Sequence, residues 1–168
     1  GEDGATHQCC EDIALMRSIP GMVVLNPADH YEMQAAVKAA AEYVGPVYIR
    51  LGRLAVESVN NNDDYAFEIG KGITLRDGKD ITIIATGLLV QEAVKAAKAL
   101  EAAGIDARVL DIHTIKPLDT ELVLKAAQET GRIVVAEEHN VIGGLGEAVS
   151  SYLSEACPTP VTKIGVYD

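Results

Sequence analysis

Polar residues that could take part in catalysis are gathered at the start of the chain, in GEDGATHQ at 1–8. Asp3 and His7 are four positions apart, so a helix beginning near Thr6 would let the carboxylate and the imidazole face one cavity. Histidine exchanges a proton near neutral pH, and a carboxylate can fix a hydroxyl or orient the imidazole. The alternative is a glycine-rich turn in which Asp3 or Thr6 caps the following helix. Residue chemistry alone leaves both interpretations open.

A second group of polar residues lies in EEHNVIGGLG at 137–146, where Glu137, Glu138 and His139 are adjacent. Metal binding is conceivable there, but the ligand spacing of known metal motifs is absent. The glycines that follow favour a loop at the end of a strand, opening a helix. GGLG does not match the dinucleotide pattern GxGxxG. Whether this loop binds a cation is left open.

The amino-acid composition argues against some classes of binding partner. The 168 residues include 14 basic and 25 acidic ones, a net charge of −11, which argues against nucleic acid because phosphate binding needs clustered Lys and Arg. The cysteines, Cys9, Cys10 and Cys157, form no disulfide framework, so we expect reduced thiols in a cytoplasmic protein. No apolar run approaches the ~18 residues of a membrane span, and we expect no membrane partner.

The periodicity of apolar residues predicts the helices and strands that carry these side chains. Over 1–60, the pattern predicts helices at 11–19 and 28–44 and buried strands at 22–26 and 47–51. Two strands rarely form a stable sheet alone. We therefore expect this segment to be the rear half of a larger α/β domain.

The helix expected at 28–44 has a start signal and an apolar stripe. Asp29 and Glu32 have the spacing of a capping box. The residues expected to face the core are Met33, Ala36, Val37, Ala40 and Ala41.

Composition changes in ESVNNNDDYAFEIG at 57–70, which shows no periodicity and reads as a linker. We place a first domain at 1–60, a linker at 61–67 and a second domain at 68–168. In the second domain, two β runs within 71–86 flank Asp77-Gly78, which is a hairpin signal.

From residue 81 onward, strands and helices alternate. The expected strands are 81–86, 106–113, 132–138 and 161–166, and the expected helices are 88–104, 118–131 and 145–157. This alternation predicts a three-layer α/β fold with a mostly parallel sheet covered by helices. The hairpin would supply one antiparallel edge strand. We interpret His113 and the turn at Lys116-Pro117 as structural.

The opening motif resembles the G-E-D-G-x-T-H-Q motif of transketolases, in the pyrimidine-binding domain of these thiamine-diphosphate enzymes. Further similar stretches follow in the same order, so that the resemblance covers nearly the whole chain: SIPGMVVLNPAD (18–29), GPVYIRLGR (45–53), LDIHTIKPLD (110–119) and VVAEEHNVIGGLGEAV (134–149). The later motifs are shared with deoxyxylulose-phosphate synthases and with β subunits of 2-oxoacid dehydrogenases. The resemblance implies the transketolase C-terminal section: part of the pyrimidine-binding domain and the whole C-terminal domain.

The resemblance also implies roles for three residues. Asp3 would bond a substrate hydroxyl near the reacting carbon, and His7 would contact substrate at the same centre and help handle its protons. Arg53 would grip the terminal phosphate of the sugar, a role that suits the bidentate guanidinium fork. Arg50, on the preceding strand, is a weaker candidate for the same task.

The expected activity is transfer of a two-carbon ketol unit from a ketose phosphate to an aldose phosphate, with thiamine diphosphate and Mg²⁺ held mostly by parts outside this chain. The expected partners are a large subunit or N-terminal diphosphate-binding domain, a second copy in a homodimer, and sugar phosphates. We expect a fragment or small subunit that is inactive alone. The alternatives are another thiamine enzyme, such as deoxyxylulose-phosphate synthase or a 2-oxoacid dehydrogenase β-type subunit, and a non-catalytic α/β interaction module.

Overall fold

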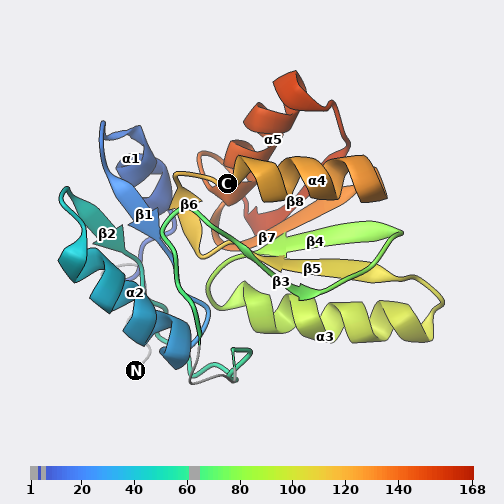
Figure 1. Ribbon diagram of the computed structural model, residues 1–168, viewed down its shortest axis with the longest axis horizontal. Coiled ribbons are helices and arrows are strands. Elements are labelled where there is room, and N and C mark those ends of the chain that lie inside the picture. Colours follow the sequence, from blue (N-terminus) through green and yellow to red (C-terminus); the bar gives the residue numbers. More distant parts are fainter. Residues whose placement is uncertain (1–3, 5–6, 61–64) are drawn as a thin grey trace.

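The computed structural model describes residues 4, 7–60 and 65–168. Its strands form two sheets, a three-stranded one in the order β2-β1-β6 and a five-stranded one in the order β3-β5-β4-β7-β8 (Figure 1). Within the described ranges, no helix has both the length and the apolar character needed to cross a bilayer.

The elements follow the predicted alternation. The first part of the chain contains α1 (Asp12–Ser18), β1 (Val23–Leu25), α2 (His30–Glu42) and β2 (Val47–Ile49). The rest contains β3 (Ile73–Arg76), β4 (Ile81–Ala85), α3 (Leu89–Ala102), β5 (Ala107–Asp111), β6 (Thr114–Lys116), α4 (Thr120–Thr130), β7 (Ile133–Asn140), α5 (Leu145–Ala156) and β8 (Val161–Val166).

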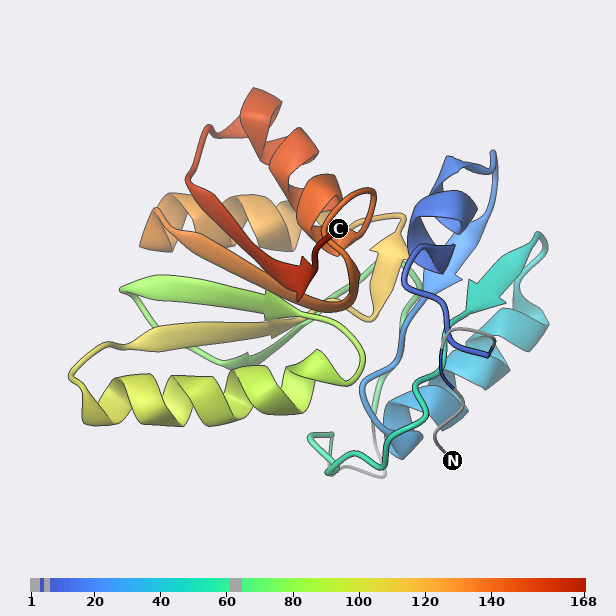
Figure 2. The same cartoon turned by 180° about the vertical axis from the view of Figure 1, so that it is seen from behind.

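The five-stranded sheet is the middle layer of the larger unit. Strands β5, β4, β7 and β8 are parallel, and β3 pairs antiparallel with β5 at one edge. Helix α3 covers one face, while α4 and α5 cover the other (Figures 1 and 2). The predicted fold class, three α/β layers with one antiparallel edge strand, is confirmed.

The hairpin expected around Asp77-Gly78 is wrong, because β3 pairs with β5 and not with β4. The turn instead passes over the start of β5. There the Asp77 carboxylate accepts a hydrogen bond from Arg108 Nε at 3.0 Å, and Lys79 N donates to Asp106 O at 3.1 Å. Strand β5 is buried along its whole length, so inserting it between β3 and β4 removes more apolar surface from water than a hairpin would.

The buried face of α2 is also rotated from the one predicted. Val37 is 45% exposed and Ala41 is exposed, whereas Glu32 and Ala36 are fully buried. One of the two hydrogen bonds of the predicted capping box forms, since the Asp29 carboxylate accepts from Glu32 N at 3.0 Å. The Glu32 carboxylate reaches past the cap residue and accepts from Ala28 N at 2.6 Å.

Strand β6, which was not expected, joins the two parts of the chain. It pairs antiparallel with β1, with Leu25 opposite Thr114, and so completes a three-stranded sheet. Ile13 and Val24 lie in the same core cluster as Ile84 of the larger sheet. Helix α1 and strand β1 therefore contribute to the same hydrophobic core as the larger sheet.

Two buried carboxyl groups meet where α2 faces the end of β5. Glu32 and Asp111 are both 0% exposed. Glu32 accepts hydrogen bonds from Ala28 N and from the Tyr65 hydroxyl, while the carboxyl oxygens of Asp111 accept none from the described chain. Burial raises the pKa of Glu32 to about 7, and burial together with the neighbouring Glu32 charge raises the pKa of Asp111.

These raised pKa values make stability depend on pH. Between the ordinary carboxyl pKa of 4.5 and about 7, the folded chain holds a proton that the unfolded chain has released, so stability falls as the pH rises through this window. We expect Glu32→Gln to flatten this fall, because the amide does not titrate. Urea unfolding at about pH 5 and about pH 8 measures the slope. The exposed Glu155→Gln is the control, and equal slopes in the two variants would contradict the assignment.

Candidate functional site

Two of the residues singled out in the sequence, His7 and Arg53, line one cavity of about 380 Å³. His7 comes from the segment before α1 and Arg53 from the segment after β2. The cavity wall also includes Arg50 and, from β7 of the larger unit, Glu138. Asp3, the other predicted catalytic residue, lies outside the described residues. The fold thus brings an imidazole and a guanidinium from distant segments to one hollow that could hold a polar, anionic substrate.

Arg50 lies in the same wall, but its guanidinium makes several contacts within the protein. Its Nε is 3.2 Å from Asp12 Oδ2, and its Nη1 is 3.4 Å from Glu138 Oε2. Its Nη2 donates to the carbonyl oxygen of Cys9 at 3.1 Å. The side chain is 11% exposed.

Tyr48 of β2 extends this network. Its hydroxyl donates to Asp12 Oδ2 at 2.8 Å. Burial, and then the hydrogen bond to the Asp12 carboxylate, raise the pKa of Tyr48 to about 12. The phenol is therefore protonated at neutral pH and serves as a donor to Asp12.

The stretch at 137–146 differs in part from the prediction. Strand β7 includes Glu137 and Glu138, as the strand expected at 132–138 implied, but it continues through His139 and Asn140, where a loop was expected; the glycines open α5 as predicted. The Glu137 carboxylate is buried and accepts hydrogen bonds from Leu145 N at 2.6 Å and from Gly146 N at 2.8 Å. This places a carboxylate at the amino terminus of α5, which it stabilises. Among the residues that the structure describes, no three His, Cys, Asp or Glu side chains are grouped to hold a metal ion.

Strand β7 also holds the segment around α1. Asn140 N donates to Cys10 O at 2.7 Å, and Ala14 N donates to His139 Nε2 at 3.3 Å. Sequence reasoning did not anticipate that Glu138 would reach the cavity. The available signal was its position near the carboxyl end of a parallel strand, where α/β proteins gather ligand-binding residues.

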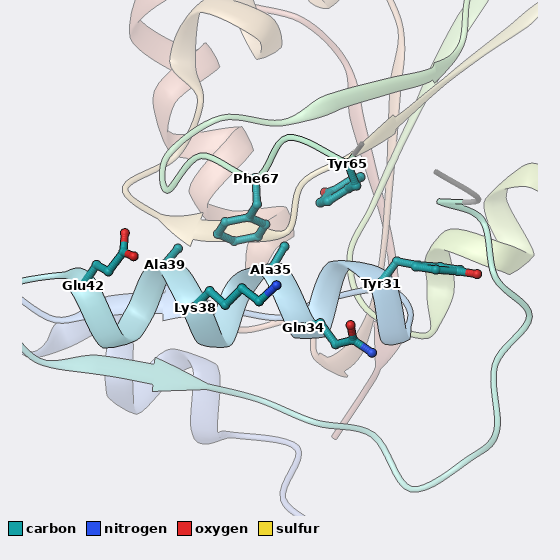
Figure 3. Close-up of a pocket in the computed structure, with 8 residues that line it drawn as sticks. All are labelled: Tyr31, Gln34, Ala35, Lys38, Ala39, Glu42, Tyr65 and Phe67. Carbon is teal, nitrogen blue, oxygen red and sulfur yellow. The ribbon is translucent and has the colours of Figure 1, made fainter. Parts of the chain in front are cut away.

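Figure 3 shows a second hollow, of about 360 Å³, between α2 and the segment of Tyr65 and Phe67. The two aromatic side chains lie over the helix face that carries Ala35 and Ala39. The centroids of the Phe67 and His113 rings are 4.2 Å apart. His113 is 1% exposed, and burial lowers its pKa to about 4, which agrees with the structural role predicted for it.

The fold and the cavity together define an α/β protein in two parts, with the cavity between the amino-terminal part and strand β7. A family model described as "Transketolase, pyrimidine binding domain" matches residues 1–58, and one described as "Transketolase, C-terminal domain" matches residues 70–168. The chain belongs to the transketolase family.

Relatives with similar sequences are also named as transketolase subunits. The chain is 46% identical to the 6-deoxy-6-sulfo-D-fructose transketolase subunit SqwH of Clostridium sp. (strain MSTE9), covering 99% of this chain and 51% of the relative. It is 49% identical to an apulose-4-phosphate transketolase subunit of Phocaeicola vulgatus, covering 100% of this chain and 54% of the relative. The chain therefore spans about half the length of these relatives. Several 1-deoxy-D-xylulose-5-phosphate synthases also match.

A solved structure supports the fold directly. The protein described as "Split gene transketolase, inactive beta4 tetramer" is 55% identical, with a TM-score of 0.95. The match covers 98% of this chain and 55% of that one.

Proposed function

We propose that this chain supplies the substrate-facing second part of a thiamine-diphosphate-dependent transketolase. The complete enzyme would move a two-carbon ketol unit from a ketose phosphate to an aldose phosphate. The proposal rests on one observation, that His7 and Arg53 line the same cavity. The two residues are 46 positions apart in the sequence (53 minus 7). The proposal includes the division of the chain into a first domain at 1–60, a linker at 61–67 and a second domain at 68–168.

The scheme gives a task to each of three residues, Arg53, His7 and Asp3. Arg53 binds the anionic tail of the sugar, because a guanidinium offers paired N–H donors to phosphate oxygens. His7 acts near the reacting carbon, where an imidazole can donate to or accept from a substrate hydroxyl. Asp3 would bond a hydroxyl at the same centre. The relatives' names include a sulfo-sugar and a sugar phosphate, both of which carry an anionic tail.

The cofactor belongs to the complete enzyme. When bound, thiamine diphosphate stabilises the carbanion left on the donor. The cavity offers groups that suit a sugar and its anionic tail. In this proposal the diphosphate and Mg²⁺ are bound mostly by parts outside this chain, as the resemblance to transketolases implies.

A large subunit or an N-terminal diphosphate-binding domain is the partner we propose, with a second copy of this chain completing a dimer. Two relatives are named as transketolase subunits, and the similar solved structure is described as an inactive tetramer. Cysteines 9, 10 and 157 are free thiols, which suits a reducing cytoplasm.

The test is ketol transfer measured with and without the partner. We expect the purified 168-residue chain to show no turnover alone and to gain it when the diphosphate-binding partner and thiamine diphosphate are added. Turnover by the chain without a partner would overturn the division of labour that we propose.

A second candidate function is deoxyxylulose-phosphate synthesis, since synthases of that name are among the relatives. It predicts a different product from the same complete enzyme. Supplying pyruvate with glyceraldehyde 3-phosphate, in parallel with a ketose phosphate donor, distinguishes the two by product analysis.

A further inference from the structure

Arg50 links the cavity wall to both parts of the chain. Asp12 of α1 holds its Nε at 3.2 Å and Glu138 of β7 faces its Nη1 at 3.4 Å, while its Nη2 binds the Cys9 carbonyl at 3.1 Å. The three contacts use the three guanidinium nitrogens. Because all three nitrogens of this guanidinium are engaged within the protein, it is poorly suited to bind a substrate that must enter and leave the cavity.

The Cys9 carbonyl belongs to the segment that carries His7. Within this segment, His7 N and Gln8 N both donate to Gly4 O at 3.1 Å. Beyond it, the next carbonyl, that of Cys10, accepts from Asn140 N at 2.7 Å. Arg50 and Asn140 thus hold consecutive peptide groups, two and three residues after His7.

Glu138 contributes from the larger unit. Its side chain is 40% exposed, against 11% for Arg50 and 9% for Asp12, so it forms the more open end of the network. Gly52 packs beside this carboxylate, since a Cβ there would stand 3.6 Å from Glu138 Oε2. The carboxylates of Asp12 and Glu138 flank the guanidinium and orient it toward the carbonyl.

We propose that Arg50, oriented by Asp12 and Glu138, is a positioning residue that fixes the His7 segment in the cavity. The consequence rests on the proposed function, because a misplaced imidazole matters only if His7 acts on substrate. The proposed function assigns the anionic tail to Arg53. Through Glu138, the larger unit takes part in shaping the site.

Kinetics of the complete enzyme test this role. We expect Arg50→Gln to lower kcat on the order of 10-fold to 100-fold, equally for phosphorylated and phosphate-free donors, because displacing a catalytic group slows each reaction alike. KM for the phosphorylated donor should change little. A rise in KM confined to phosphorylated donors would instead make Arg50 an anion anchor and overturn the proposal.

A double-mutant cycle separates positioning from a general structural role. If Glu138 acts through Arg50, Glu138→Gln should lower kcat in the parent enzyme but have no further effect in the Arg50→Gln background. Additive losses would contradict the network. Thermal unfolding of each variant shows whether the fold is retained.

A readout independent of activity keeps this test distinct from that of the proposed function. In hydrogen exchange on this chain, Arg50→Gln should speed exchange of peptides covering residues 7–11 and leave those covering α3 unchanged. Faster exchange without any ketol transfer in the parent enzyme would reject the proposed function while keeping the positioning role. Unchanged exchange at 7–11 would reject the positioning role itself.

Discussion

Arg53→Ala in the complete enzyme should lower kcat/KM for a phosphorylated donor by roughly 30-fold to 1,000-fold, because losing a charge-assisted bidentate contact costs on the order of 2–4 kcal/mol. Arg53 lines the cavity with His7 and follows the strand that ends at Ile49. Its guanidinium would meet the far end of the sugar and not the reacting carbon. The measurement is kcat/KM for a ketose phosphate with both enzymes.

Two comparisons make the result specific. Hydroxypyruvate is a short donor without phosphate, so Arg53→Ala should change its kcat/KM little. Under the proposed function His7 lies near the reacting carbon, so His7→Ala should lower kcat/KM for both kinds of donor. If Arg53→Ala harms the two donors equally, Arg53 does not bind the anionic tail. Arg53→Lys, which keeps the charge but not the fork, should fall between the parent enzyme and the Ala variant.

Local signals in the sequence predicted much of the larger unit. Helix α4 begins where Asp119 accepts from Leu122 N at 3.0 Å and ends at Gly131, whose φ of 65° suits glycine. Helix α3 buries Val90, Ala93 and Ala97 as its apolar stripe required. Caps and stripes are properties of neighbouring residues, so the sequence shows them directly.

Pairing between distant segments could not be predicted in the same way. An Asp-Gly pair indicates a turn but not the partner of the strands beside it, and β5, which follows 22 residues after Ala85 (107 minus 85), inserted between them. The buried face of α2 differs from the predicted one because Glu32 is buried against Asp111 and Tyr65. The pattern of apolar residues does not reveal these contacts. Burying a carboxylate runs against the usual rule for helix faces.

The resemblance to a family named His7, Asp3, Arg53 and, as a weaker candidate, Arg50, but it did not predict that Glu138 would lie beside Arg50 in the cavity wall. Glu138 lies 88 positions from Arg50 in the sequence, and only the pairing of the two parts brings them to 3.4 Å. A solvent-facing Glu and a cavity Glu have the same appearance in a sequence. The distinction depends on which strand end the residue occupies once the sheet has formed.

Glu137→Ala should destabilise the fold by roughly 3 kcal/mol or more, because hydrogen bonds to a charged group contribute about 1.5–3 kcal/mol each and two buried N–H donors would lose their acceptor. The Glu137 carboxylate accepts from Leu145 N and Gly146 N at the start of α5. Its charge also faces Arg17, which donates to the carbonyl oxygens of Gly143 and Gly144. Removing the carboxylate would therefore leave the two N–H groups at the helix end without their acceptor, and Glu147 would be the remaining carboxylate facing the guanidinium of Arg17.

Urea unfolding of the chain measures this cost, with Glu155→Ala on the exposed side of the same helix as the control. Glu137→Gln should lower the free energy of unfolding less than Glu137→Ala does. The glutamine amide oxygen can still accept a hydrogen bond from one of the two N–H groups, although its NH2 group would face the other. The midpoint should fall in the order parent, Gln, Ala, and Glu155→Ala should stay near the parent. If Glu137→Ala and Glu155→Ala unfold together, the carboxylate does not hold α5 in place, and the helix depends on the packing of Leu145, Val149 and Leu153 alone.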